Sequence, residues 1–179
     1  MYRWLVGCCL IGLLGSCATL SQNECLTADW YQIGLRDGYD GQPRARLAQH
    51  RDACTRFGVR PDEPAYFSGR EQGLHQYCTA TRGFEVGSAG RTYQQVCTPL
   101  TEPDFMRGYL LGQDLHRDRE RLRRIETDTR ALERRLRAAD DAEERESLRR
   151  RIRFLDEDSA FLRRQLLQRE EQALQQGYR

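Results

Sequence analysis

The sequence predicts a mainly α-helical protein. It would have a small disulfide-stapled helical head with a glycine-rich loop or short hairpin, followed by a C-terminal antiparallel coiled-coil helical hairpin. Three observations predict this class. Residues 25–112 hold four cysteines and most of the glycines, and three segments there share an aromatic–glycine motif at helical spacing. Residues 113–179 lack cysteine and proline and carry apolar residues in heptads.

Residues 1–16 are expected to be a lipoprotein signal peptide. After Arg3, residues 4–14 give an apolar stretch of about 11 residues, whereas a membrane-spanning helix needs roughly 20. The stretch ends in "LLGSC", which resembles a bacterial lipobox, in which the cysteine becomes the lipidated first residue. We expect a lipid on Cys17 and a lipidated linker over residues 17–24. A plain cleaved signal, or an apolar N-terminal helix in a cytosolic protein, is the alternative.

The expected location is the cell envelope, with the protein lipid-anchored to the outer membrane and facing the periplasm. Ala18 follows Cys17 where an Asp would resemble an inner-membrane retention signal. The membrane is thus one expected partner, through Cys17. A net charge of +2 gives no concentrated basic surface, so no nucleic-acid partner is expected, and no motif calls for a cofactor.

Four cysteines remain once the signal peptide is removed and Cys17 is lipidated: Cys25, Cys54, Cys78 and Cys97. An even number in an oxidising compartment predicts two disulfides. Of the three possible pairings we favour the sequential one, because each bridge then encloses one local unit.

Two histidines offer an alternative use of these cysteines. His50 precedes Cys54 by four residues and His75 precedes Cys78 by three, so the set could bind zinc or supply a Cys–His nucleophile. Because both uses need free thiols, we expect no metal ligand and no catalytic residue, although an enzyme is not ruled out by sequence.

An aromatic-x-x-Gly-x-x-x-Gly motif occurs three times, as "YQIGLRDG" (31–38), "YFSGREQG" (66–73) and "FMRGYLLG" (105–112). On a helix the aromatic residue and both glycines share one face. Glycine disfavours a helix interior by about 1 kcal/mol relative to alanine, so we expect the three helices to pack closely through these faces into one core, with capping as a second role of the glycines. Helix ends capped by Gly38 and Gly73 are the alternative.

Local signals place short helices around these motifs. We expect helices over 30–38, 43–56 and 66–77, the last introduced by Asp62 and Pro64, and a further helix that begins near "TEPDF" (101–105). The segment "GFEVGSAGRTYQQVC" (83–97) carries three glycines and is predicted to be a loop or a small hairpin.

Several of these segments together resemble a known family. "ECLTADWYQIGLRDGYDG", "HRDAC…GVRPD…Y…GREQGLHQYC" and "GFEVGSAGRTYQQVC" are similar to small bacterial envelope lipoproteins classed as a domain of unknown function. The similarity covers roughly residues 24–115. It implies a lipobox, paired cysteines and no established activity, so no catalytic residue is carried over.

The C-terminal part contains two apolar seams. One runs from Leu122 to Ala139 and the other from Leu148 to Leu166, both in steps of three and four, but in different registers. Between them, Asp141 and Glu144 form a capping-box-like pair. We therefore expect two helices that fold back around a turn at residues 138–142, with one long stuttered helix as the alternative.

The expected function is non-enzymatic: a structural or protein-interaction role through the coiled-coil arm, which would bind another envelope protein or itself. The competing hypothesis is an enzyme or a small-ligand or peptidoglycan-binding module in the glycine–aromatic head. The candidate ligand site for that hypothesis is Glu71, His75, Arg91 and Tyr93.

Overall fold

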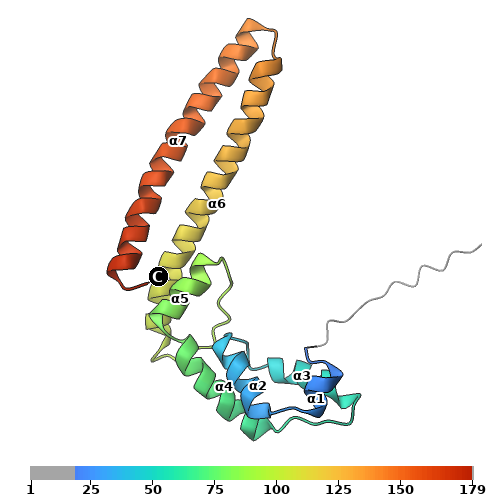
Figure 1. Cartoon of the computed structure of the whole chain (residues 1–179). Coiled ribbons are helices and arrows are strands. Elements are labelled where there is room, and N and C mark those ends of the chain that lie inside the picture. Colours follow the sequence, from blue (N-terminus) through green and yellow to red (C-terminus); the bar gives the residue numbers. More distant parts are fainter. Residues whose placement is uncertain (1–18, 179) are drawn as a thin grey trace, which may run out of the picture.

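The computed structural model describes residues 19–178, so the predicted signal peptide and Cys17 lie outside the described residues. The described chain is built from helices, with no strand (Figure 1). These are α1 Gln22–Leu26, α2 Trp30–Tyr39, α3 Arg46–Thr55, α4 Glu63–Tyr77, α5 Ala80–Ser88, α6 Glu102–Ala138 and α7 Ala142–Gln175. The predicted mainly helical class, with a stapled head and a helical hairpin, is confirmed.

Helices α2 and α4 pack with their backbones in contact at the glycines of the motif. A Cβ atom added to Gly34 would lie 1.9 Å from the carbonyl oxygen of Tyr66, and one added to Gly69 would lie 2.0 Å from that of Tyr31. Gly73 lies inside α4, four residues before its end, so close packing rather than capping explains this glycine. The predicted close packing through the motif faces is confirmed for α2 and α4, but the expected single core of three motif helices is wrong, because the third motif lies in α6 and packs on α5.

Helices α5 and α6 repeat this arrangement. A Cβ atom on Gly83 would lie 2.0 Å from the carbonyl oxygen of Phe105, and one on Gly108 would lie 1.9 Å from that of Ala80. The prediction of a loop or hairpin from residue 83 was wrong for residues 83–88, which belong to α5. Contact with α6 requires these glycines inside the helix, and Ala80 in place of an aromatic residue hides a fourth copy of the motif.

The head therefore consists of two equivalent helix pairs, which we call unit 1 (residues 25–77) and unit 2 (residues 78–115). In each unit a glycine with positive φ follows the first helix: Gly41 with φ 66° and Gly90 with φ 68°. The next residue then donates its N–H back into that helix, to Asp37 O at 2.8 Å in unit 1 and to Val86 O at 3.0 Å in unit 2. Helix α3 has no counterpart in unit 2.

Each unit contains one disulfide and one apolar core. Cys25 pairs with Cys54, with their Cα atoms 5.4 Å apart, and Cys78 pairs with Cys97, with their Cα atoms 5.6 Å apart. The predicted sequential pairing is confirmed. Closing loops of this size stabilises a fold by about 3 kcal/mol each, chiefly by restricting the unfolded chain. The cores centre on the buried aromatic residues Tyr66 in unit 1 and Phe105 in unit 2.

The arm is a hairpin of two long helices (Figure 1). Helix α6 starts in unit 2 and continues without a break across the expected boundary at residue 112, and the chain turns between Ala138 and Ala142. The Asp141 carboxylate accepts a hydrogen bond of 2.7 Å from the N–H of Glu144, as the capping pair predicts. The hairpin is confirmed over the single long helix. Its buried seam residues are Ile125, Leu132, Ala139, Leu148, Leu162 and Leu166.

Ion pairs across the hairpin fix the register of its two helices. Arg121 binds Asp158 at 2.9 Å, and Arg163 binds Glu126 at 3.2 Å. Such exposed pairs each contribute less than about 1 kcal/mol, so the apolar seam supplies most of the stability.

The base of the arm is attached to the head. Tyr178 is buried and stacks on Phe84 of α5, with the ring centres 5.1 Å apart. In residues 19–178, no helix combines the length and the apolarity that a membrane crossing requires.

Candidate functional site

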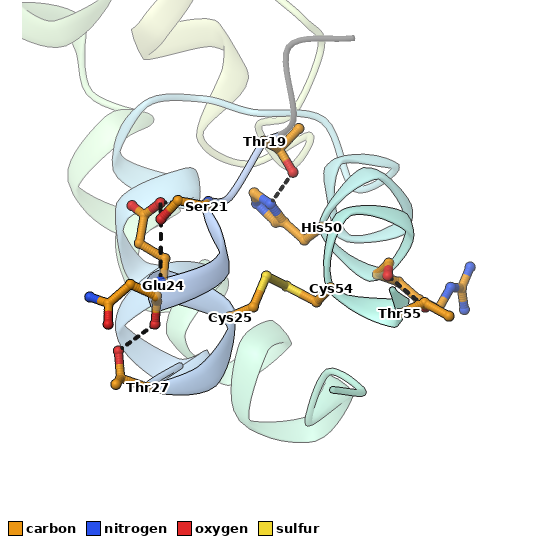
Figure 2. The surroundings of a disulfide bond; sticks show 10 residues. Thr19, Ser21, Glu24, Cys25, Thr27, His50, Cys54 and Thr55 are labelled. Carbon is orange, nitrogen blue, oxygen red and sulfur yellow. Dashed lines mark hydrogen bonds between the residues drawn. A yellow bond between two sulfur atoms is a disulfide. The ribbon is translucent and has the colours of Figure 1, made fainter. Parts of the chain in front are cut away.

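The described chain enters the core of unit 1 at once. Leu20 is 2% exposed and packs into the unit 1 core, and the Thr19 hydroxyl lies 2.7 Å from His50 Nδ1 (Figure 2). Ser21 then caps α1 through a reciprocal pair of hydrogen bonds with Glu24, and Cys25 ties α1 to α3. The described chain is therefore fixed to the head from its first residue, Thr19.

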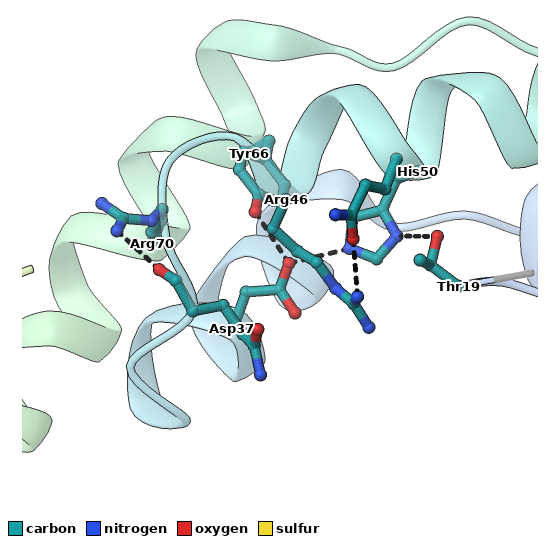
Figure 3. A network of polar contacts seen from close by, with 8 residues as sticks. Thr19, Asp37, Arg46, His50, Tyr66 and Arg70 are labelled. Carbon is teal, nitrogen blue, oxygen red and sulfur yellow. Dashed lines mark hydrogen bonds and ion pairs between the residues drawn. The ribbon is translucent and has the colours of Figure 1, made fainter. Parts of the chain in front are cut away.

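A buried polar cluster holds this segment. His50 Nε2 lies 2.8 Å from Asp37 Oδ2, and the Tyr66 hydroxyl donates to the same oxygen at 2.7 Å (Figure 3). Asp37 is 6% exposed, His50 1% and Tyr66 0%. Because a carboxylate only accepts, Nε2 donates to Asp37, and a neutral imidazole then accepts the Thr19 hydroxyl at Nδ1.

The cluster favours an ionised Asp37. Burial alone raises the pKa of a carboxyl group, but the hydrogen bonds from His50 and Tyr66 outweigh burial and hold the pKa of Asp37 below its ordinary value of 3.8. Burial and the bond to Asp37 raise the pKa of Tyr66 far above its ordinary value, so this phenol stays protonated and remains a donor.

Unit 2 shows that the helix pair can form without this cluster. When the two units are aligned by their equivalent glycine contacts and turns, Val86 corresponds to Asp37, and Phe105 corresponds to Tyr66. Both are buried in the apolar core of unit 2. The polar cluster is thus special to the unit that receives the N-terminal segment.

An Asp–His–hydroxyl order also occurs in nucleophilic hydrolases, where the His takes a proton from the hydroxyl. In this cluster Tyr66 shares the Asp37 oxygen that binds His50, and all three side chains lie in the core. The arrangement joins α2, α3, α4 and the Thr19 segment, and we assign it a structural role.

The four residues of the predicted ligand site lie on different parts of the head. Glu71 and His75 are exposed on α4, whereas Arg91 and Tyr93 belong to the loop after α5. The Tyr93 hydroxyl donates to Glu102 at 3.0 Å and accepts from the N–H of Cys97 at the same distance. Burial raises the pKa of Tyr93 to about 12. Within the described residues, no hydrogen bond or ion pair joins any two of these four.

The residues of the alternative zinc or Cys–His site are engaged elsewhere. Cys54 and Cys78 each form a disulfide, so neither supplies a thiolate. His50 belongs to the buried cluster, and His75 is exposed on α4.

A polar cleft that the sequence did not predict lies where the two units meet. It has a volume of about 560 Å³. Its polar lining includes Gln42, Arg46, Gln49, Tyr77, Arg91 and Gln94. The sequence carried only an indirect signal for this cleft. Gly41 and Gly90 each lie three residues after the second glycine of a motif, and Gln42 and Arg91 directly follow them.

Comparison with known proteins agrees with the resemblance at the level of a domain. Residues 29–114 match the family model described as "Protein of unknown function (DUF2799)". The match begins at the N-cap of α2, covers nearly all of the rest of both units and ends inside α6, so most of the arm lies outside it. Neither the curated proteins nor the solved structures contain a match to this chain.

Proposed function

We propose that this protein is a lipid-anchored envelope protein that docks another envelope protein on the outer surface of its arm. The observation that carries the proposal is an apolar groove on the distal half of the hairpin. This groove has a volume of about 650 Å³, and Ala131, Leu132, Phe154 and Leu155 form its apolar lining.

Two phenylalanines extend this surface along α7. Phe154 is 69% exposed and Phe161, two turns further on, is 49% exposed. Residues seven apart lie on the same side of a helix. The hairpin seam is already closed by other residues, so neither exposed ring is needed to hold α6 and α7 together. Complete burial of one such side chain by a partner contributes about 1.5–3 kcal/mol.

The rim of the groove is close to neutral. Arg135 and Arg150 border it but are paired with Glu144 and Glu146, and Arg151 is offset by Asp128. A neutral rim around an apolar centre favours a partner segment that contributes apolar side chains.

The start of the head supports the anchor. Thr19 and Leu20 are fixed in unit 1. The two residue steps from a lipidated Cys17 to Thr19 span at most about 7 Å, so the lipid would hold the head close to the membrane surface. The arm leaves from the other unit, since α6 belongs to unit 2. The head then fixes the protein at the membrane, and the arm presents the groove.

Cross-linking in intact cells followed by purification of the chain tests the proposal. The variant Phe154→Ser/Phe161→Ser should lose a cross-linked partner that wild type retains. Leu110→Ser, which changes an exposed leucine of unit 2, is the matched control and should keep it. An unchanged partner in the double variant contradicts the docking surface, and a product of twice the chain mass identifies self-association. Cys17→Ser should release the protein from membranes, and unchanged membrane fractionation contradicts the anchor.

A further inference from the structure

We propose that the polar cleft between the two units binds a small organic carboxylate that also carries hydroxyl or amide groups. This proposal concerns the head alone and stands independently of the docking function of the arm. It rests on the walls, the floor and the charges of the cleft.

The two walls are equivalent turns, and each is held by an equivalent residue. The Arg70 guanidinium donates to the carbonyl oxygen of Gln42 at 2.7 Å, and the Tyr109 hydroxyl donates to that of Arg91 at 3.1 Å. The two residues are equivalent in position: Arg70 directly follows Gly69 on α4, and Tyr109 directly follows Gly108 on α6. Both walls therefore have a fixed backbone in the absence of a ligand, and such preorganisation lowers the ordering cost of binding.

The floor of the cleft is rigid as well. Tyr77 and Val86 line it, and each is 2% exposed. A Cβ atom on Gly41 would lie 2.2 Å from the Tyr77 ring, so the turn rests directly on this ring. Cys78, which follows Tyr77, is tied to the loop of unit 2 by its disulfide with Cys97.

Two guanidinium groups line the cleft without an acidic partner in residues 19–178, those of Arg46 and Arg91. Arg46 is held by the side-chain oxygen of Gln49 at 2.7 Å, and its Nε atom is buried without a hydrogen-bond partner. Several exposed arginines of the arm, among them Arg119, Arg121 and Arg163, instead bind carboxylates. Unpaired guanidinium groups at a half-open polar cleft favour an anion, which they bind through charge-assisted hydrogen bonds.

The balance of charge selects the class of anion. Asp40 also lines the cleft. Its neighbour Arg82, at 3.9 Å, is paired more closely with Glu85, at 2.7 Å, so the Asp40 carboxylate offsets one of the two charges of Arg46 and Arg91 and leaves one positive charge in excess. One excess charge suits a carboxylate better than a phosphate dianion. The amides of Gln42, Gln49 and Gln94 can donate and accept, and they match neutral hydroxyl and amide groups on the same ligand.

Two sugars that differ by one lactyl group, which carries the carboxylate, test the proposal. The full chain, purified in mild detergent, is titrated with N-acetylmuramic acid, with N-acetylglucosamine, which lacks the lactyl carboxylate, and with inorganic phosphate, with binding followed by saturation-transfer NMR. We expect saturable binding of the acid and at least tenfold weaker binding of the other two.

Variants locate the site. Arg46→Gln and Arg91→Gln should each weaken binding of the acid at least tenfold, whereas Arg60→Gln, which removes the same charge from an exposed loop, should leave it unchanged. Arg91 has an exposed side chain, so its variant keeps the fold even if Arg46→Gln loosens α3. Equal binding of both sugars, tighter binding of phosphate, no saturation, or unchanged binding by Arg91→Gln overturns the proposal.

Discussion

Replacing Gly34 with alanine tests the close packing of α2 on α4. The new Cβ atom would lie 1.9 Å from the carbonyl oxygen of Tyr66, whereas an ordinary contact begins at 3.4 Å. The two backbones must therefore separate by up to about 1.5 Å at this point. Both sides of the contact are helix backbone, so a change of side-chain rotamer cannot relieve it.

The expected loss of stability follows from two opposed effects. Overpacking a core costs 1–3 kcal/mol, and a backbone contact that cannot yield belongs at the upper end of that range. Alanine in place of glycine returns about 1 kcal/mol of helix propensity. We expect Gly34→Ala to destabilise the head by about 2 kcal/mol, which lowers the Tm of a domain of about 90 residues by roughly 10 °C.

Trp30 provides the signal for this measurement, because it lies in α2 and is buried. Thermal unfolding is followed by its fluorescence in a Trp4→Phe background, with the disulfides intact. Ser68→Ala, an exposed substitution beside Gly69 on α4, is the control and should leave the Tm within about 2 °C. A Gly34→Ala protein as stable as wild type, or more stable, refutes backbone contact between the helices.

Three further predictions concern the buried cluster and the arm. Asp37 has a folded-state pKa below 3.8, so its contribution to stability is present above pH 4 and is lost as the pH falls below that value. The variant Asp37→Asn should therefore show a flatter dependence of Tm on pH between pH 5 and pH 3 than wild type does. An unchanged slope contradicts this prediction. Asp37→Val leaves two buried groups without a partner and should cost about 2–5 kcal/mol in denaturant unfolding. In Asp37→Val/His50→Leu/Tyr66→Phe the first and last changes reproduce Val86 and Phe105 of unit 2, and His50→Leu removes the buried imidazole, so this variant should recover more than half of that loss. Spin labels at Arg124 and Arg163 should be separated by about 15–30 Å, because neighbouring helix axes lie about 10 Å apart; a single helix would place these residues, 39 positions apart, at about 58 Å.

The sequence predicted the arm well because its information is local. The two seams, their change of register and the Asp141–Glu144 pair all lie within the segment that they describe. The same holds for α4, whose start is marked by Asp62 and Pro64. In each case a short-range pattern and the buried face agree.

The head was harder to predict, because its glycines act through partners far along the chain. Gly83 and Gly87 suggest a helix breaker when read locally, but in α5 they meet the backbone of α6 more than 20 residues away. The aromatic residue that marked three of the motifs is replaced by Ala80 in the fourth, so the duplication went unseen.

The candidate site required the same long-range information. Asp37, His50 and Tyr66 lie on three helices, and no spacing in the sequence joins them. Arg91 was included in the predicted ligand site, but the sequence grouped it with Glu71 and His75 rather than with Arg46. Only the contact between the two units brings Arg46 and Arg91 to one cleft.

Site-specific photo-cross-linking in intact cells tests the central claim, that the arm is the docking surface, most directly. A photoreactive residue is placed at Phe161 and, as the control, at Arg149, which is also exposed but lies on a different side of α7. We predict a discrete cross-linked product from position 161 that is absent from position 149. Products from position 149 alone, or the same products from both positions, would contradict the claim.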